Sequence, residues 1–430
     1  MKFRIQSPLY FVRFSPHFTP HRRNRQLYPQ FSTTARRRYV PNMFMFNTTT
    51  TIHGRPRGQL TPQEYFTFRD DKWWPVEPPP TPASTSTSTS TSTQPSTTPN
   101  PFRLSVLSWN IDFMRDEDDA RMSAALDYLA TYIADIHREN ENSAAVVVML
   151  NEMTAGDLRL IKLTGWIREG YDITDATTVD WESDAYGTTM LIPRSLSISS
   201  VGRLHYFITA MQRDALFVDI SLPLPQQPLS SSSNSSSHET ENATTTNPPP
   251  GPILRLCTTH LESLAAKPPK RPAQLAAAAE YLRGGRKSDP KGGGGGKVLG
   301  GILGGDLNAI EAFDKTLPGE CGLKDAFLEN GGKEGEEGGM TWGQMAEPWQ
   351  RARFGLGRLD KILFCGEEKA LKLVGFKTFG LGVTITDQQA AERLLQRGSL
   401  EQPWVTDHLG VRADFLVEVP GIGDQKEEAG

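Results

Sequence analysis

Two uninterrupted apolar runs, Ala144–Leu150 and Val298–Leu303, constrain the fold more than any other feature of the sequence. Both have the length of a strand, and neither shows the polar alternation of a strand with one face in water. Such runs are typical of strands that are buried on both faces. Each is followed directly by polar residues, Asn151-Glu152 after the first and Gly304-Gly305-Asp306 after the second. We therefore expect two central strands whose ends present carboxylates.

Further apolar patterns surround these two strands. Six more strands are predicted at Arg103–Trp109, Tyr186–Ile192, Leu216–Leu222, Ile253–Thr258, Leu359–Phe364 and Val411–Val419. Helices are predicted at Ala120–Glu139 and Ala273–Leu282. A chain that runs strand, helix, strand, then through several strands, then strand, helix and strand again is typical of an α/β (α+β) protein with two packed sheets.

Low-complexity segments divide the chain without ending the strand pattern. Three of them, at 225–251, 284–297 and 330–339, are rich in Ser, Asn, Thr, Pro, Gly or Glu and lie between predicted strands. Surface loops tolerate such insertions because the entropy of closing a loop grows only logarithmically with its length. We therefore predict one catalytic domain at 102–420 that carries three disordered inserts, followed by a tail at 421–430.

The first hundred residues differ in composition from this domain. Residues 1–63 hold 11 Lys and Arg and no Asp or Glu, and they include Arg36-Arg37-Arg38. An Arg-rich, acid-poor segment is typical of a mitochondrial transit peptide, and a basic tail with a nuclear or nucleic-acid role is the alternative. Residues 64–101 combine an aromatic segment with a Ser/Thr/Pro-rich linker. We expect a soluble mitochondrial or nuclear protein, since no apolar run is long enough to cross a membrane.

Charge and cysteine usage exclude several classes of protein. The formal net charge is -4, but outside residues 1–63 there are 35 basic and 50 acidic residues. An acidic body does not attract a polyanion through its overall field, so a nucleic acid would need a local groove and metal ions. The three cysteines, Cys257, Cys321 and Cys365, are far apart. They argue against a zinc site or a disulfide framework and favour a reducing compartment.

Six short polar motifs stand at or beside the predicted strand ends. They are Trp109-Asn110, Asn151-Glu152, Thr259-His260-Leu261-Glu262-Ser263, Gly305-Asp306-Leu307-Asn308, Arg358-Leu359-Asp360-Lys361-Ile362 and Thr406-Asp407-His408-Leu409-Gly410. In this order they resemble the signature of the endonuclease/exonuclease/phosphatase superfamily, over nearly the whole predicted domain. The resemblance implies a metal-dependent phosphodiester hydrolase. It also implies a four-layer α/β sandwich, in which two packed mixed β-sheets are flanked by helices.

Within this superfamily the chain resembles the tyrosyl-DNA phosphodiesterase 2 branch. The His260–Ser263 motif carries that resemblance, supported by Trp109–Asp112, Thr341-Trp342 and Tyr186–Leu191. The resemblance implies, as substrate and partner, DNA with a 5′-tyrosyl or peptide adduct left by a trapped topoisomerase. Hydrolysis would release the tyrosine and leave a 5′-phosphate, which places the enzyme in DNA repair. A monomer is the expected state.

Hydrolysis of a phosphodiester requires neutralised charge, an aligned water and a stabilised leaving oxygen. Mg²⁺ prefers oxygen ligands and keeps several waters, so one or two carboxylates suffice to hold it. We predict Glu152 as the primary metal ligand, with Asn110 and Asp407 completing the shell, and Mn²⁺ as a possible substitute. Asp306 is predicted to orient or deprotonate the attacking water. Asn308 would hold that water or a phosphate oxygen, although an Asx-turn is its alternative role.

The remaining predicted site residues act on the phosphoryl group and its substituents. His260 and His408 are expected to donate hydrogen bonds to the phosphoryl oxygens, with Asp360 paired to His408. Catalysis also requires that the substrate be held in place. Trp342 and Tyr186 are therefore predicted to pack against the terminal nucleotide or the tyrosine ring. Arg213 is predicted to contact phosphate. For the two aromatic residues, a purely structural place in the core or on a strand face is the alternative.

The sequence departs from the family at two basic positions. Ile310 stands where the family pattern has an Arg that touches phosphate, and Leu264 follows the histidine motif where a basic residue is expected. Lys267, Lys270 or Arg271 could substitute. These changes favour, as an alternative, another hydrolase on the same fold, such as an abasic-site or RNA nuclease or a phosphoinositide phosphatase. A non-catalytic binding module is a third hypothesis, against which the complete set of chemical residues argues.

Overall fold

The computed structural model describes residues 49–51, 53–76, 101–222, 251–285 and 296–419. The Ser/Thr/Pro-rich linker, the C-terminal tail, most of the first two predicted inserts and residues 1–48 of the basic segment lie outside the described residues. None of the described helices is both long enough and apolar enough to cross a membrane.

Two mixed sheets form the centre of the fold. The seven-stranded sheet runs, in spatial order, β1 (Leu60–Pro62), β8 (Ser197–His205), β9 (Asp214–Ser221), β10 (Ile253–Thr259), β11 (Val298–Asp306), β13 (Asp360–Gly366) and β12 (Lys324–Asp325). The eight-stranded sheet runs β14 (Leu371–Phe379), β15 (Gly410–Val417), β4 (Phe102–Asn110), β5 (Ala144–Met153), β7 (Gly187–Pro193), β6 (Tyr171–Ile173), β2 (Tyr65–Arg69) and β3 (Lys72–Val76). All ten predicted strands and helices are present, within a few residues of their predicted bounds.

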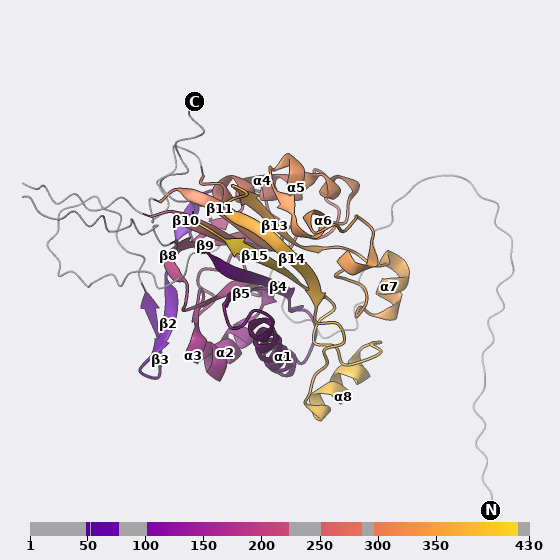
Figure 1. Cartoon of the computed structure of the whole chain (residues 1–430). Helices are drawn as coiled ribbons and strands as arrows, with labels where there is room; N and C mark the ends of the chain where they lie inside the picture. The colour runs from indigo at the N-terminus through magenta and orange to yellow at the C-terminus, as the bar shows by residue number, and fades with distance from the viewer. Residues whose placement is uncertain (1–48, 52, 77–100, 223–250, 286–295, 420–430) are drawn as a thin grey trace, which may run out of the picture. The chain divides into compact units, whose positions relative to one another are not determined.

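Helices cover the outer faces of both sheets (Figure 1). The helical elements are α1 (Asp118–Glu139), α2 (Ala155–Leu163), α3 (Gly165–Gly170), α4 (Arg271–Leu282), η1 (Ala312–Lys315), α5 (Leu317–Glu320), α6 (Ala326–Glu329), η2 (Glu337–Gly339), α7 (Pro348–Phe354) and α8 (Gln388–Arg397). One apolar core lies between the sheets, a second under α1 to α3, and a third under α4 and α5. The predicted α/β sandwich of two packed mixed sheets flanked by helices is confirmed.

The two continuous apolar runs become the strands predicted to be central. Strand β5 pairs in parallel with β4, and β11 pairs in parallel with β10. The residues of both runs are buried almost throughout, because a sheet face and a helix layer cover them from opposite sides. At Gly305 the backbone φ is +156°, and a Cβ there would lie 1.8 Å from the Thr259 carbonyl oxygen. This glycine therefore allows β11 to end directly against β10.

Three features differ from the sequence prediction. Strands β8 and β14 lie in the described sheets but were not predicted. Strands β1 to β3, within 60–76, belong to the two sheets, so a catalytic domain that begins at residue 102 leaves out three of its strands. The insert predicted as disordered at 330–339 is placed against the domain, because Glu334 forms ion pairs with the buried Arg358 and Lys361.

Candidate active site

The polar motifs meet where the parallel strand pairs of the two sheets end. Asn110 is the last residue of β4, Asp306 the last of β11 and Asp360 the first of β13, while His260 follows β10 directly. Asp306 and Asp360 are register partners on neighbouring strands. Because the two sheets face each other, these strand ends bring side chains from both sheets into one buried cluster.

Glu152 reaches this cluster through a β-bulge. The pairing of β5 with β7 shifts register between Leu150 and Met153, and Glu152 has a φ of 57°. A bulge of this kind re-aims a side chain that would otherwise follow the strand alternation. Asp112, Gln212, Leu264 and Asn308 around the site also have positive φ. Strained backbone of this kind gathers at functional sites, where the surrounding structure holds it in place.

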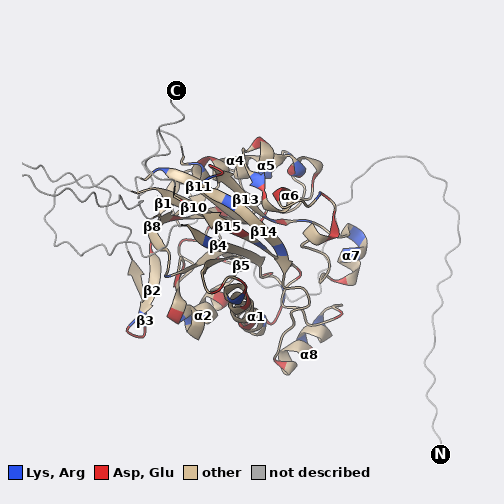
Figure 2. Cartoon of the chain, in the orientation of Figure 1, with Lys and Arg blue, Asp and Glu red and all other residues tan. Residues whose placement is uncertain are grey.

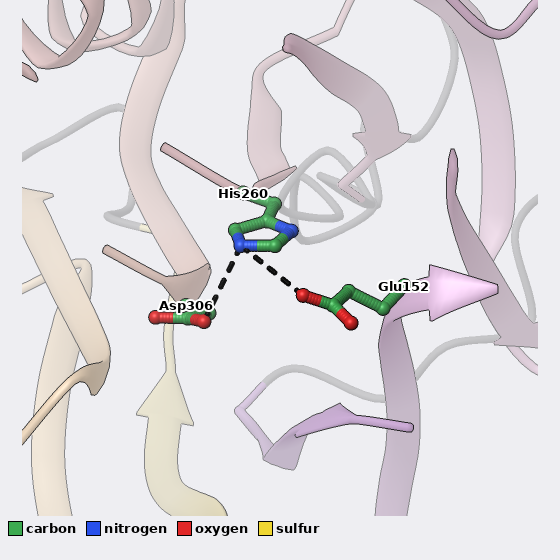
Figure 3. Close-up of side chains that lie close together, drawn as sticks. All are labelled: Glu152, His260 and Asp306. Carbon is green, nitrogen blue, oxygen red and sulfur yellow. Dashed lines mark ion pairs between the residues drawn. The ribbon is translucent and has the colours of Figure 1, made fainter. Parts of the chain in front are cut away.

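Glu152, His260 and Asp306 lie together at the centre of the site (Figure 3). His260 Nε2 is 3.3 Å from Asp306 Oδ2 and 3.7 Å from Glu152 Oε1. The side chains of His260 and Asp306 are each only 3% exposed, whereas that of Glu152 is 15% exposed. Glu152 therefore borders the opening, and the other two groups form the floor.

Asp306 is held by donors from both sheets. Its Oδ1 accepts from Asn308 N at 2.9 Å and its Oδ2 from Asn110 Nδ2 at 3.1 Å. Its own N–H donates to Asn151 Oδ1 at 3.0 Å. Burial alone would raise the pKa of Asp306, but its contact with His260 and the nearby His408 charge hold that pKa below its usual range. A carboxylate that stays ionised and fixed on three sides is suited to orient a water rather than to take its proton.

His260 is neutral, and its tautomer follows from Arg213. Arg213 Nη1 lies 2.6 Å from His260 Nδ1. A guanidinium can only donate, so Nδ1 accepts and the proton of the neutral ring sits on Nε2. Burial and the Arg213 charge lower the pKa of His260 to about 4. The Nε2 atom has no hydrogen-bond partner among the described residues, so this N–H is directed at the site.

His408, unlike the neutral His260, is cationic. Its Nδ1 lies 2.8 Å from Asp360 Oδ2, and its Nε2 lies 3.9 Å from Asp306 Oδ2 and 3.8 Å from Asp407 Oδ1. Burial alone would lower the pKa of His408, but the charges of Asp360 and Asp407 raise it well above its usual value. The predicted pairing of His408 with Asp360 is present, and it gives the site a cationic donor near the same Asp306 oxygen that His260 approaches.

The carboxylates at the opening fit a hard cation. Burial, followed by the charge of Asp112, raises the pKa of Glu152 to about 7, and burial and Asp407 raise the pKa of Asp112. Acidic groups that raise each other's pKa are relieved by a positive charge between them. Oxygen donors are what Mg²⁺ and Mn²⁺ prefer. Asn110 turns its amide nitrogen to Asp306, and its Oδ1 accepts from Asp112 N at 2.9 Å, so its role as a metal ligand stays a prediction.

Arg213 and Tyr186 form a cation–π pair beside His260. The Arg213 guanidinium lies 4.9 Å from the centroid of the Tyr186 ring, a cation–π contact, and Arg213 Nη2 donates to Ser263 Oγ at 2.9 Å. The Tyr186 hydroxyl donates to Met211 O. Phe113 covers the ring from another side, with centroids 4.3 Å apart. A narrow pocket opens between Tyr186, Arg213 and His260.

Other predicted residues take places that the sequence did not reveal. The Trp342 indole N–H donates to Asp407 Oδ2 at 2.8 Å, so this residue fixes a carboxylate as well as offering a ring face. Arg271 is buried and paired with Asp314 and Glu311. It therefore does not replace the basic residue expected after the histidine motif. Ile310, at the other position that departs from the family, is 50% exposed.

Three residues of the site were not predicted. Asp112 and Phe113 enter through the turn after β4, where Phe113 N donates to Glu152 Oε2 at 3.1 Å. Asn151, buried, joins the sheets by donating to Thr258 Oγ1 at 3.2 Å and accepting from Asp306 N. Both Asp112 and Asn151 stand inside the quoted motifs, so their positions next to Asn110 and Glu152 were the available signal.

A family model and several solved structures are similar to this chain. The sequence model of the "Endonuclease/Exonuclease/phosphatase family" matches residues 107–408. Solved structures with a similar fold include zebrafish (D. rerio) TDP2 complexed with single strand DNA product, with 18% identity, TM-score 0.48 and coverage of 73% of this chain and 98% of that one. Truncated Caenorhabditis elegans TDP2 has 20% identity, TM-score 0.46 and coverage of 74% and 98%. The human Nocturnin catalytic domain has 16% identity, TM-score 0.42 and coverage of 74% and 93%.

No curated protein matches the sequence. The family match nevertheless spans well over half of the chain, from the end of β4 to His408, and includes every motif that meets in the site. The chain belongs to the endonuclease/exonuclease/phosphatase family.

Proposed function

We propose that this protein is a Mg²⁺-dependent phosphodiesterase that hydrolyses the bond between a tyrosine side chain and the 5′ end of DNA. The observation that carries the proposal is the cation–π pair of Arg213 and Tyr186 beside His260. Arg213 lies over the Tyr186 ring and 2.6 Å from His260 Nδ1, which would place a guanidinium and an aromatic side chain beside the leaving group. The resemblance of His260–Ser263 and Thr341-Trp342 to the tyrosyl-DNA phosphodiesterase 2 branch supports the same substrate.

The residues present fit a divalent cation at Glu152, supported by Asp407 and by the oxygen of Asn110. When bound, Mg²⁺ would supply positive charge to the phosphoryl oxygens and the leaving oxygen. Asp306 would align the attacking water, because its carboxylate stays ionised and is fixed by Asn308 and Asn110.

The two histidines would both donate hydrogen bonds to the phosphoryl group. His260 offers a neutral Nε2–H, and His408 a cationic one, so charge that develops on the oxygens in the transition state meets two fixed donors. Arg213 would hold the leaving tyrosine by its ring while keeping His260 in the donating tautomer. Trp342, anchored to Asp407, would face the terminal nucleotide.

A different substrate on the same fold is the second candidate. Ile310, 50% exposed, offers no charge to a DNA phosphate at a position next to Asn308. This observation favours a smaller diester, or a nucleic acid held mainly at its end.

The test uses the full chain and a short single strand of DNA that carries a 5′-phosphotyrosine. Tyrosine release should require Mg²⁺, stop with EDTA, and exceed turnover of an abasic-site duplex, single-stranded RNA and a soluble phosphoinositide. Glu152→Gln should reduce kcat/KM by about 10³-fold, while Glu169→Gln, an exposed glutamate on α3, should not change it. If another of the four substrates is cut faster, the specificity proposed here is wrong although the hydrolytic site stands.

A further inference from the structure

The first described residues of the chain fold back against the sheet that carries Arg213. Thr50 and Pro56 form a β-bridge, and Arg57 N donates to Thr49 O at 3.0 Å. The N–H of Gly58 donates to His205 O at 2.7 Å, which attaches this segment to β8. We call residues 53–57 the strap. It stands outside the matched family region, 107–408.

The strap pairs with the loop that leads to Tyr186. Ion pairs join it to that loop at His53–Asp184, Arg55–Asp180 and Arg57–Glu182. The first pair is largely in water, with Asp184 64% exposed, whereas the Arg57 and Glu182 side chains are 1% and 0% exposed. Loss of the buried pair should therefore disturb the surrounding structure more than loss of the exposed pair.

Glu182 connects this buried pair to both members of the cation–π pair, Tyr186 and Arg213. It lies four residues before Tyr186 in the same loop. Its N–H donates to Asp214 Oδ2 at 3.2 Å, and its carbonyl accepts from Gln212 Nε2 at 3.4 Å. Gln212 and Asp214 flank Arg213 in the chain. Glu182 therefore ties the Tyr186 loop to the Arg213 loop, with its carboxylate facing the strap.

We propose that Arg57 is a positioning residue that holds the cation–π pair, Tyr186 and Arg213, in place beside His260; the inference rests on the proposed function. The buried Glu182 carboxylate is contacted by Arg57 and, at 2.9 Å, by His205 Nδ1. Without the guanidinium the buried carboxylate loses one of these two partners, and the loops it joins move with it. Displacement of the cation–π pair weakens binding of an aromatic leaving group and loosens His260, while the carboxylates and His408 keep their places.

The test compares full-chain variants on 5′-phosphotyrosyl DNA. Arg57→Met should lower kcat/KM about tenfold, with a higher KM because the leaving group is held less well and a lower kcat because Arg213 no longer fixes the tautomer of His260. Arg57→Lys should recover part of the loss. His53→Ala, the matched change at the exposed pair, should leave both constants unchanged. Glu182→Gln combined with Arg57→Met should be no worse than Arg57→Met alone, since the two residues act as one unit.

A second readout does not depend on the substrate. Backbone hydrogen exchange at residues 182–187 and 209–214 should accelerate in Arg57→Met, or in Arg57→Lys if the first variant does not fold, and stay unchanged in His53→Ala. Unchanged exchange in both segments, or a loss confined to kcat, overturns the role of Arg57. If wild type does not release tyrosine at all, the proposed function fails, and the exchange result still decides whether the strap positions these loops.

Discussion

At the residue scale, the site contains one neutral histidine, His260, and one cationic histidine, His408. Arg213 beside His260 and Asp360 beside His408 set this difference, since each partner fixes one ring nitrogen at 2.6 Å and 2.8 Å, respectively. Under the proposed function, a neutral donor and a cationic donor near one phosphoryl group would spread its negative charge without placing two imidazolium cations together. The contrast depends on the partners rather than on the histidines, so changes in the partners test it.

Replacement of Asp360 by Asn should move the alkaline limit of activity. Burial lowers the pKa of His408, and the Asp360 charge raises it. Without that charge the pKa falls toward neutrality, so His408 loses its proton, and kcat/KM declines, at lower pH than in wild type. We expect about a 10²-fold loss at the wild-type alkaline limit, seen in kcat/KM measured across neutral and alkaline pH. An alkaline limb that does not move would show that His408 is not the cationic donor.

The acid limit should depend on the metal concentration. Burial and Asp112 raise the pKa of Glu152 to about 7, and a protonated carboxyl does not bind a cation. Activity should therefore fall as pH drops below about 7 at low Mg²⁺. Because metal and proton compete for the same carboxylate, each tenfold rise in Mg²⁺ should shift this limb by up to about one pH unit toward acid. A limb that ignores Mg²⁺ would exclude Glu152 as the ligand.

At the element scale, the apolar runs allowed most strands to be predicted, and the polar residues at their ends allowed the site to be predicted. Strand β8 was missed because Ser, Arg and His interrupt its pattern. Arg203 and His205 are nevertheless fully buried, and Arg203 pairs there with Asp175 and Asp214. Strand β14 was missed because most of its residues are only partly buried or exposed. Its apolar residues therefore form neither a continuous run nor a clear alternation.

What the sequence could not supply at this scale is the bulge. The strand alternation of β5 does not reveal that Glu152 adopts a φ of 57°, because this conformation results from pairing with β7, a distant partner. The same holds for the hydrogen bonds that tie Asp306 to Asn151 across the two sheets. Long-range contacts such as these are fixed by packing and not by local pattern.

Asn151 offers a test of this connection between the sheets. Asn151→Ala would leave the buried Asp306 N–H and Thr258 hydroxyl without this partner. We expect a loss of about 1–3 kcal/mol in the free energy of unfolding, together with lower kcat, because Asp306 is no longer fixed. Urea unfolding and steady-state kinetics measure the two effects. Thr131→Ala, on the exposed face of α1, should change stability by less than about 0.5 kcal/mol; equal effects would show that Asn151 has no special role.

At the scale of the whole molecule, charge is distributed rather than gathered. Figure 2 shows Lys or Arg and Asp or Glu on the same helices, as on α1 and α8. Outside residues 1–63 acidic residues outnumber basic ones, 50 to 35. A chain of this kind does not concentrate DNA at its surface by a long-range field. Under the proposed function, recognition would depend on the few cationic groups at the site, of which Arg213 and His408 would already act on the reacting end.

Ile310 therefore sets the salt dependence expected of DNA turnover. Wild type should show a shallow slope of log kcat/KM against log salt, because few phosphates beyond the scissile one are contacted. Ile310→Arg places a cation beside Asn308, so it should raise kcat/KM at low salt and steepen the slope by about 0.7–0.9, the value for one added phosphate contact. Val374→Arg, on edge strand β14, adds the same charge elsewhere and should leave the slope unchanged. If both variants steepen it equally, net charge and not a phosphate contact at position 310 governs DNA binding. If neither does, DNA does not pass position 310, and the substrate is bound by its end alone.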